Sequence, residues 1–284
     1  MFRYLKICLT LQIILCATIT GCNNLQTRIK NADELANKNN FIKKIVSTEK
    51  FNIVSYQKIN SSSDDAVIYI EGDGLSWLNK YRISDNPTPV NPVALELATL
   101  DQSPNVIYLG RPCQYQDIKT EISCTPDYWT NKRASYEIIH SIDTAISKIV
   151  NHLNIKKIRL VGYSGGGTIA AILAATRKDV IDLRTIAGNL DIDTFSKIHN
   201  VSPLSDSLNP IDYAEKLVKV PQVHFVSTND DIIKKEITAS YIQNLKKYDN
   251  NLGCVKLIES TTSSHSTGWT SIWRNNLSYN FRCN

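Results

Sequence analysis

Six nearly continuous apolar runs stand out in the pattern of hydrophobic and polar positions along this 284-residue chain. They occupy residues 66–70, 105–109, 157–162, 183–188, 222–227 and 254–259. Short runs rich in Val and Ile, without regular alternation of polar residues, are typical of strands buried on both faces. Two further strand-like runs precede them, near residues 41–46 and 51–59. The pattern therefore predicts a mostly parallel central sheet.

Segments with helical spacing of apolar residues lie between these runs. They predict helices over residues 92–100, 133–153, 166–177, 210–218, 234–247 and 270–278. Strands that alternate with helices are typical of an α/β fold with helices on both faces of the sheet. Because such sheets bind their ligands at the carboxyl ends of the strands, the residues that follow each strand are the first candidates for a site.

The segment GYSGG at residues 162–166 follows one strand and opens a helix. It fits the G-x-S-x-G pattern, in which a serine sits on a tight strand-to-helix turn with its hydroxyl exposed. The residues two before and two after Ser164 must be small, because strand and helix nearly touch there. Ser164 would lie at a helix N-terminus, where free N–H groups favour an oxyanion. A phosphate-binding loop is the alternative, but neither GxxxxGK[ST] nor GxGxxG is present.

A nucleophilic serine needs a base, and the chain offers five histidines. His265 follows the last strand among small polar residues, so its ring can reach over the strand ends; it is the favoured base. His199, in a loop, is the alternative. The other three lie on the long helix or inside a strand: His140, His152 and His224.

A base of this kind is oriented by a carboxylate. The loop TNDDII at residues 228–233 follows a strand and offers Asp230 and Asp231. Their side chains point in different directions, so only one can face the histidine. The competing role for either residue is to cap the next helix.

At this point the chain resembles the α/β-hydrolase superfamily, whose members carry Ser, acid and His in this chain order. The acid of that family is usually followed by one residue and two aliphatic residues, and this resemblance favours Asp230. The segments YIEGDGLSW, YLGRPCQY, CTPDYW, VGYSGGG, IAGNLD, SPLSDSLNP and HSTGW are similar to those of bacterial envelope hydrolases that are often lipoproteins. The resemblance covers roughly residues 65–274 and implies no particular reaction.

The same resemblance implies an oxyanion hole made of two backbone N–H groups, one from Gly165 and one from the loop after residues 66–70. Many family members carry His-Gly in that loop, whereas this chain has EGDG at residues 71–74, which would make Asp73 the second donor. A carboxylate there would oppose the oxyanion unless it is turned away or paired. Arg111 is a plausible partner for it.

Access to the site is expected to be open or lightly covered. The family commonly inserts a lid after the strand that follows the serine unit, but only about 32 residues lie between Gly188 and Pro221. The loops at 75–91 and 111–131 carry aromatic residues that either rim the site or pack as loop cores.

The first 21 residues differ from the rest of the chain. Arg3 and Lys6 precede an apolar run and small residues, as in a secretory signal peptide. The segment ITGC resembles a bacterial lipobox, which implies that Cys22 is lipidated; a plain signal peptide cut nearby is the alternative. By the same resemblance, Asn23 at the next position favours an anchor in the outer membrane, facing the periplasm. Residues 22–40 are polar and Asn-rich and are predicted to be a flexible tether. A single α/β-hydrolase domain is expected over residues 41–284.

Charge and cysteine content narrow the functions further. Without the signal, 30 Lys and Arg face 27 Asp and Glu, too small an excess for a nucleic-acid-binding protein. Four cysteines remain beyond Cys22, and proximity in sequence favours the disulfides Cys113–Cys124 and Cys254–Cys283. The sequence contains no CxxC pair, so it gives no indication of a zinc site.

The leading hypothesis is a membrane-tethered serine hydrolase that cleaves a carboxylic ester or related acyl bond through Ser164, Asp230 and His265, without a metal or cofactor. An acyltransferase or peptidase would use the same residues. An envelope binding lipoprotein that kept the fold without turnover is the alternative from another class, and Asp73 is the feature that motivates it.

Overall fold

An eight-stranded sheet forms the centre of the molecule, with strand order β1-β2-β6-β3-β7-β8-β9-β10. The computed structural model describes residues 24–60, 63–277 and 281–283. The six strands from β6 to β10 in this order run parallel to one another, whereas β1 and β2 are antiparallel to their neighbours. The strands are β1 (Ile42–Ser47), β2 (Asn52–Ile59), β3 (Asp65–Ile70), β6 (Asn105–Leu109), β7 (Lys157–Tyr163), β8 (Val180–Ile186), β9 (Gln222–Ser227) and β10 (Val255–Ser260). The mostly parallel sheet predicted from the apolar runs is confirmed.

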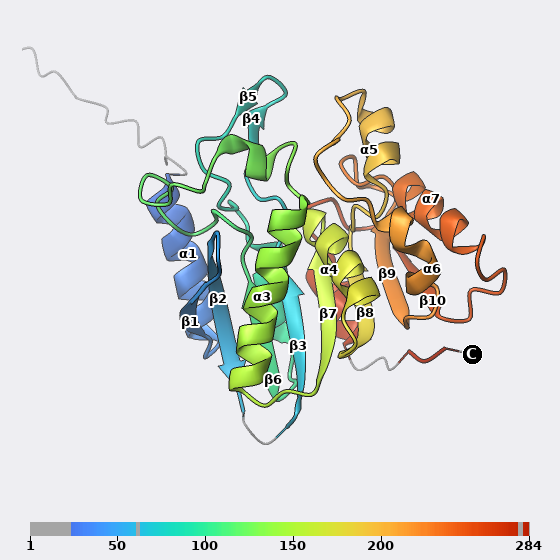
Figure 1. The fold of residues 1–284 in the computed structure, drawn as a ribbon, viewed down its shortest axis with the longest axis horizontal. Helices are drawn as coiled ribbons and strands as arrows, with labels where there is room; N and C mark the ends of the chain where they lie inside the picture. Colours follow the sequence, from blue (N-terminus) through green and yellow to red (C-terminus); the bar gives the residue numbers. More distant parts are fainter. Residues whose placement is uncertain (1–23, 61–62, 278–280, 284) are drawn as a thin grey trace, which may run out of the picture.

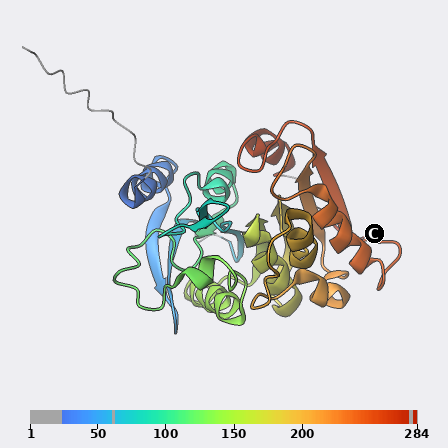
Figure 2. The ribbon, with the colours of Figure 1, turned by 90° about the horizontal axis from the view of Figure 1, so that it is seen from above.

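Helices cover both faces of this sheet (Figures 1 and 2). On one face, α3, α4, α6 and α7 pack over the side chains of Ile68, Ile107 and Leu160. On the other, α1, α2 and α8 pack over Tyr69, Tyr108 and others. Alternate residues of the central strands thus enter two separate cores, which is why β3 and β6 are mostly apolar. The helices are α1 (Leu25–Lys38), α2 (Val93–Leu100), α3 (Tyr136–His152), α4 (Gly165–Thr176), α5 (Ile192–His199), α6 (Ala214–Leu217), α7 (Lys235–Leu245) and α8 (Trp269–Asn276), with 3-10 turns η1 (Pro126–Trp129) and η2 (Pro210–Tyr213).

The flexible tether predicted for residues 22–40 is wrong in its described part, because helix α1 occupies most of it. The side chain of Asn24 caps this helix by accepting from the N–H of Thr27 at 2.8 Å. Arg28, Ala32 and Ala36 are buried at four-residue spacing. The Arg28 guanidinium donates to backbone carbonyls of the loop at 86–88, which binds the helix to the domain. The buried face of α1 consists of two alanines and an arginine, which gives only a weak apolar pattern. For this reason the polar composition of residues 22–40 indicated a linker.

The N-terminal segment up to residue 23 lies outside the described residues, and with it the predicted signal peptide and Cys22. Within the described ranges, none of the helices combines the length and the apolar character needed to cross a bilayer.

Two elements near the carboxyl ends of the strands were not predicted. A short hairpin, β4 (Trp77–Asn79) and β5 (Arg82–Ile83), rises from the loop after β3, and α5 follows β8. Figure 1 shows both at the end of the sheet where the parallel strands terminate. Each is too short to give a clear periodic signal.

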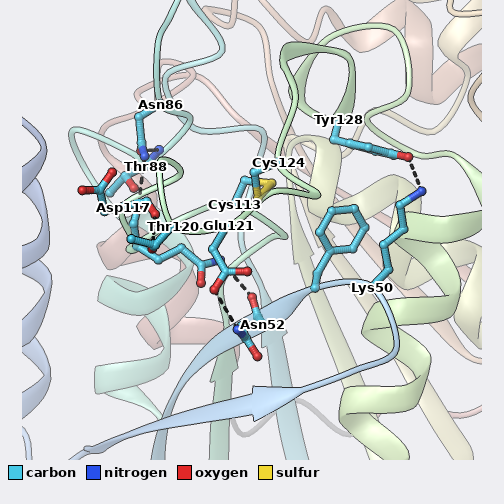
Figure 3. The surroundings of a disulfide bond; sticks show 12 residues. Lys50, Asn52, Asn86, Thr88, Cys113, Asp117, Thr120, Glu121, Cys124 and Tyr128 are labelled. Carbon is cyan, nitrogen blue, oxygen red and sulfur yellow. Dashed lines mark hydrogen bonds between the residues drawn. A yellow bond between two sulfur atoms is a disulfide. The ribbon is translucent and has the colours of Figure 1, made fainter.

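Two disulfides, Cys113–Cys124 and Cys254–Cys283, join the pairs that sequence proximity favours. The first lies in the long loop after β6 (Figure 3). Near it, Asn52 of β2 donates to the carboxylate of Glu121 at 2.7 Å, and Lys50 donates to the Tyr128 hydroxyl. The bridge and these two contacts fix a loop that has little regular structure.

Removing either disulfide is expected to lower the free energy of unfolding, because the crosslink restricts the unfolded chain. The bridges close loops of 11 and 29 residues, which corresponds to roughly 3 and 4 kcal/mol. Urea unfolding of Cys113→Ser/Cys124→Ser and Cys254→Ser/Cys283→Ser measures both. Equal stability of the wild type and both double variants would contradict the presence of the bridges.

Candidate active site

Ser164 lies between β7 and α4 in a strained backbone conformation, with φ 50° and ψ −121°. The glycines around it permit this turn. A Cβ at Gly162 would lie 2.4 Å from the carbonyl oxygen of Gly166, and one at Gly166 would lie 2.3 Å from that of Ile70. Real Cβ atoms do not come so close, so both positions require glycine. The predicted close approach of strand and helix is therefore present, and it pushes Ser164 out at the start of α4.

Two backbone N–H groups beside Ser164 are available to a ligand. Among the described residues, the amides of Gly165 and Asp73 donate to no carbonyl or side chain. Gly165 is the first residue of α4, where helix geometry leaves N–H groups unpaired. The two segments touch, since a Cβ on Gly165 would lie 2.1 Å from the Asp73 carboxylate. These are the two amides that the sequence predicts as donors to an oxyanion.

Asp230 and His265 are brought together by the loops after β9 and β10. Oδ2 of Asp230 is 2.9 Å from Nδ1 of His265. Oδ1 accepts from the N–H groups of Ile232 and Ile233, each at 2.8 Å. Asp230 therefore fixes the turn after β9 with one oxygen and contacts His265 with the other, whereas helix α7 begins at Lys235 and has no side-chain cap. Its side chain is fully buried, so the carboxylate is held in place behind the ring.

Asp231 and the remaining histidines occupy other environments. Asp231 is exposed to solvent. His199 donates from Nε2 to the carbonyl of Ile232 at 2.7 Å, and no carboxylate in the described part of the chain contacts its ring. His224 is buried in the sheet between Thr185 and Gln222, and burial lowers its pKa to about 3. His140 and His152 lie on α3, as expected.

Ser164 and His265 line the same cavity. The hydroxyl of Tyr163, next to Ser164, donates to the carbonyl oxygen of His265 at 2.9 Å, and the two rings lie 5.3 Å apart. Tyr163 therefore links the loop that carries His265 to the serine turn. The Ser164 hydroxyl forms no hydrogen bond with a described residue, including His265. Hydrogen bonds of active sites are often formed only when substrate binds.

The Asp73 carboxylate is paired with two arginines. Arg111 Nη1 lies 3.0 Å from Oδ1, and Arg133 Nη1 lies 2.9 Å from Oδ2. Burial alone would raise the pKa of Asp73, but the two guanidinium groups outweigh it and hold the pKa below its ordinary value. The partner expected from the sequence, Arg111, is present, and Arg133 is an additional one. This cluster of three residues therefore carries one excess positive charge beside Ser164.

Glu71, two residues before Asp73, is buried beneath the cavity. Its carboxylate accepts from the N–H of Gly72 at 2.9 Å and from the hydroxyl of Tyr108 at 3.0 Å. Burial raises the pKa of Glu71 to about 7, although these hydrogen bonds partly oppose the shift. The folded protein therefore favours the protonated form of this group more than the unfolded chain does.

This shift predicts a pH dependence of stability that Glu71→Gln removes. Because the folded pKa is raised from 4.5 to about 7, the favourable contribution is fully present below pH 4.5 and is lost as the pH rises to 7. The free energy of unfolding of the wild type should fall relative to Glu71→Gln by about 3 kcal/mol across this interval. Urea unfolding at several pH values measures it. Glu96→Gln, at an exposed position on α2, serves as control, and parallel curves for wild type and Glu71→Gln would contradict the assignment.

The cavity has a volume of about 1250 Å³, somewhat above the range of roughly 300–1,000 Å³ for small-molecule sites. Hairpin β4–β5 contributes Trp77 and Ile83 to one wall, whereas Phe195 and residues 199–205, in α5 and its following loop, form another. Of the aromatic residues in the two long loops, Trp77 is partly exposed at the cavity, whereas Tyr128 and Trp129 are buried. The short segment after β8 thus contributes a wall of the cavity.

No group of three or more His, Cys, Asp or Glu side chains within the described ranges is arranged to hold a metal ion.

Sheet order, helices on both faces and the serine turn after β7 define the class of structure: the chain has the α/β-hydrolase fold. An esterase from Pyrococcus furiosus is similar over 86% of this chain and 92% of its own, with a TM-score of 0.60 and 14% identity. Est1E from Butyrivibrio proteoclasticus is similar over 83% and 95%, with a TM-score of 0.58 and 11% identity.

An acylaminoacyl peptidase from Pyrococcus horikoshii matches 84% of this chain and 40% of its own, with a TM-score of 0.58 and 11% identity. No protein-family model and no curated protein matches the sequence. At identities this low, the likeness establishes the fold.

Arg133, Tyr163 and Glu71 are the site residues that the sequence did not reveal. Arg133 lies in an irregular loop before α3, far in sequence from Asp73, and no motif connects the two. Tyr163 is the variable residue of the G-x-S-x-G pattern. Of the three, only Glu71 could have been recognised as a candidate site residue, because it is an acidic residue directly after a buried strand.

Proposed function

We propose that this protein is a serine hydrolase that cleaves a carboxylic ester or a related acyl bond. The observation that carries the proposal is the contact of 2.9 Å between Asp230 and His265 beside the cavity that also contains Ser164. The strained backbone of Ser164 and the unpaired amides of Gly165 and Asp73 support it independently. The esterases among the similar structures agree with this class of substrate.

In the proposed reaction, Oγ of Ser164 attacks the acyl carbonyl while Nε2 of His265 takes its proton. Asp230 accepts from Nδ1, which fixes the ring and stabilises its charged form. The developing oxyanion accepts from the amides of Gly165 and Asp73. The charged histidine returns the proton to the leaving alcohol, which departs and leaves an acyl group on Ser164. Water, activated by the same histidine, then releases the acid and restores the serine.

The pairing of Asp73 supports a catalytic role over a purely binding one. A free carboxylate next to the amides would repel the oxyanion. Because Arg111 and Arg133 both contact Asp73, the cluster presents a net positive charge to that position instead.

A panel of 4-nitrophenyl esters from acetate to octanoate tests the proposal with the purified full chain. Turnover of at least one ester is expected, and Ser164→Ala should reduce it to the uncatalysed rate. Ser202→Ala, at an exposed serine that also lines the cavity, should keep the wild-type rate. Absence of turnover throughout, or equal turnover by wild type and Ser164→Ala, would contradict the proposal.

We also propose that a lipid on Cys22 anchors the protein to the bacterial outer membrane, facing the periplasm, once residues 1–21 have been removed as a signal peptide. The support is the sequence pattern around ITGC. Because α1 begins at Leu25, little chain would separate the anchor from the folded domain. Cys22→Ala should move the protein from the membrane to the soluble fraction of cells, whereas unchanged fractionation would contradict the anchor.

A further inference from the structure

We propose that the ester cleaved by this protein carries a second, negatively charged group close to the reacting carbonyl, and that Arg133 binds this group. The inference rests on the proposed hydrolase function and names the substrate class of the same site.

The balance of charge at the serine turn is the first argument. Arg111 and Arg133 together carry two positive charges, and the Asp73 carboxylate between them compensates one. One neutralising cation would be enough to protect the oxyanion from Asp73. The second leaves a positive charge that Asp73 does not compensate, at the wall of a cavity where screening by solvent is weaker than at the surface.

Arg133 is the arginine of the pair that faces the cavity. It is among the residues that line the cavity, whereas Arg111 lies behind and is buried. Nε of Arg133 donates to the carbonyl of Thr130 at 2.8 Å, and Nη1 donates to Asp73. The guanidinium also lies 5.9 Å from the ring centre of Phe195. Three contacts therefore hold it in one orientation.

Nη2 of Arg133 is the nitrogen left for a ligand. It donates to no described residue and is not among the fully buried polar atoms that lack a partner. A fixed guanidinium with an accessible N–H edge is a suitable partner for a carboxylate or a phosphate group, because the charge-assisted hydrogen bond then needs no reordering of the side chain.

The acidic side chains around the cavity do not oppose an anion there. Among the described residues that line it, the carboxylates are Glu71 and Asp73. Asp73 is paired with the arginines, and Glu71 points its oxygens at Gly72, Ala94 and Tyr108. Lys80, on the turn of hairpin β4–β5, adds a further positive charge to the wall.

The position of Arg133 limits the length of the substrate's acyl or alcohol part. Asp73 touches Gly165 on one side and Arg133 at 2.9 Å on the other. Only one side chain therefore separates the guanidinium from the amides proposed to bind the oxyanion. The anionic group should lie a few bonds from the carbonyl, as in a half ester of a short dicarboxylic acid.

The test compares three esters of the same leaving group with the purified full chain at low salt. They are the 4-nitrophenyl half ester of glutaric acid, 4-nitrophenyl pentanoate and the 4-nitrophenyl ester of monomethyl glutarate. A fourth ester, the pentanoate of 3-hydroxybenzoate, places the anion on the leaving group, with phenyl pentanoate as its neutral counterpart. Values of kcat/KM are compared after subtraction of the uncatalysed rates.

A preference of about tenfold or more for an anionic ester over its neutral counterpart is expected. Arg133→Gln should reduce this preference to near one, and Arg133→Lys should keep part of it. Lys132→Gln is the matched control, because Lys132 is an adjacent cation that pairs with Asp127 and does not line the cavity. It should leave the preference unchanged. Circular dichroism verifies that each variant is folded.

Three results would overturn the inference. The first is a wild-type kcat/KM for both anionic esters that is equal to or lower than the value for their neutral counterparts. The second is an equal loss for anionic and neutral esters in Arg133→Gln, which would mean that Arg133 supports the oxyanion only. The third is a preference that survives Arg133→Gln. In all three, turnover of the neutral esters leaves the hydrolase proposal standing, whereas absence of turnover of every ester overturns the hydrolase proposal and the inference together.

Discussion

His265→Ala is expected to lower kcat for an aryl ester by roughly 10⁵- to 10⁶-fold. Without the imidazole, the Ser164 hydroxyl has no base, and the leaving alcohol receives no proton. Among the described residues, His199 also lines the cavity, but it donates to a backbone carbonyl and contacts no carboxylate of the described ranges, so it is a poor substitute. Stopped-assay measurement of 4-nitrophenol release over hours, with the uncatalysed rate subtracted, covers this range.

His199→Ala is the matched control for this variant. It removes a histidine from the same cavity and should change kcat by no more than a few-fold. If His199→Ala were the variant that lost activity and His265→Ala kept it, the base would have been assigned to the wrong loop.

Asp230→Asn is expected to lower kcat by about 10⁴-fold. An amide at this position can donate to Nδ1 of His265, which would favour the tautomer whose Nε2 carries the proton and cannot act as a base. In the wild type, Oδ1 of Asp230 accepts hydrogen bonds from two backbone amides, and the side-chain carbonyl oxygen of Asn can still accept both. The loop should therefore keep its shape while the chemistry fails.

Asp231→Asn separates the two adjacent acids. Asp231 is exposed, so its replacement should leave kcat within a few-fold of the wild type. Thermal unfolding of both variants verifies that the loop after β9 is intact. A wild-type rate for Asp230→Asn together with a large loss for Asp231→Asn would contradict the assignment of the acid.

The sheet and the serine turn could be predicted from the sequence because both follow from local rules. A strand buried on both faces is mostly apolar, and the runs at residues 66–70 and 105–109 have this composition. The turn at Ser164 needs glycine where backbone atoms touch, and this steric demand appears directly as a motif. His265 and the pair Asp230 and Asp231 followed from their positions after strands, because a parallel sheet brings the ends of its strands to one edge. The choice of Asp230 over Asp231 came from the resemblance to the α/β-hydrolase superfamily.

Helix α1 and the contact of Arg133 with Asp73 were not predicted, because they depend on contacts distant in sequence. Ala32 and Ala36 are buried only because the helix packs close to the domain, and small residues give little hydrophobic signal. Arg133 reaches Asp73 across 60 positions of sequence. A loop arginine beside a buried carboxylate cannot be told from a surface arginine by its neighbours in the chain.

The most direct test of the central claim is covalent labelling of Ser164. The purified full chain is incubated with a fluorophosphonate, and the adduct is located by mass spectrometry of the digested protein. The account predicts one adduct, on the peptide that contains residue 164, whose rate of formation falls to background in His265→Ala and which is absent from Ser164→Ala. No adduct on the folded wild-type protein, or an adduct of undiminished intensity in Ser164→Ala, would contradict it.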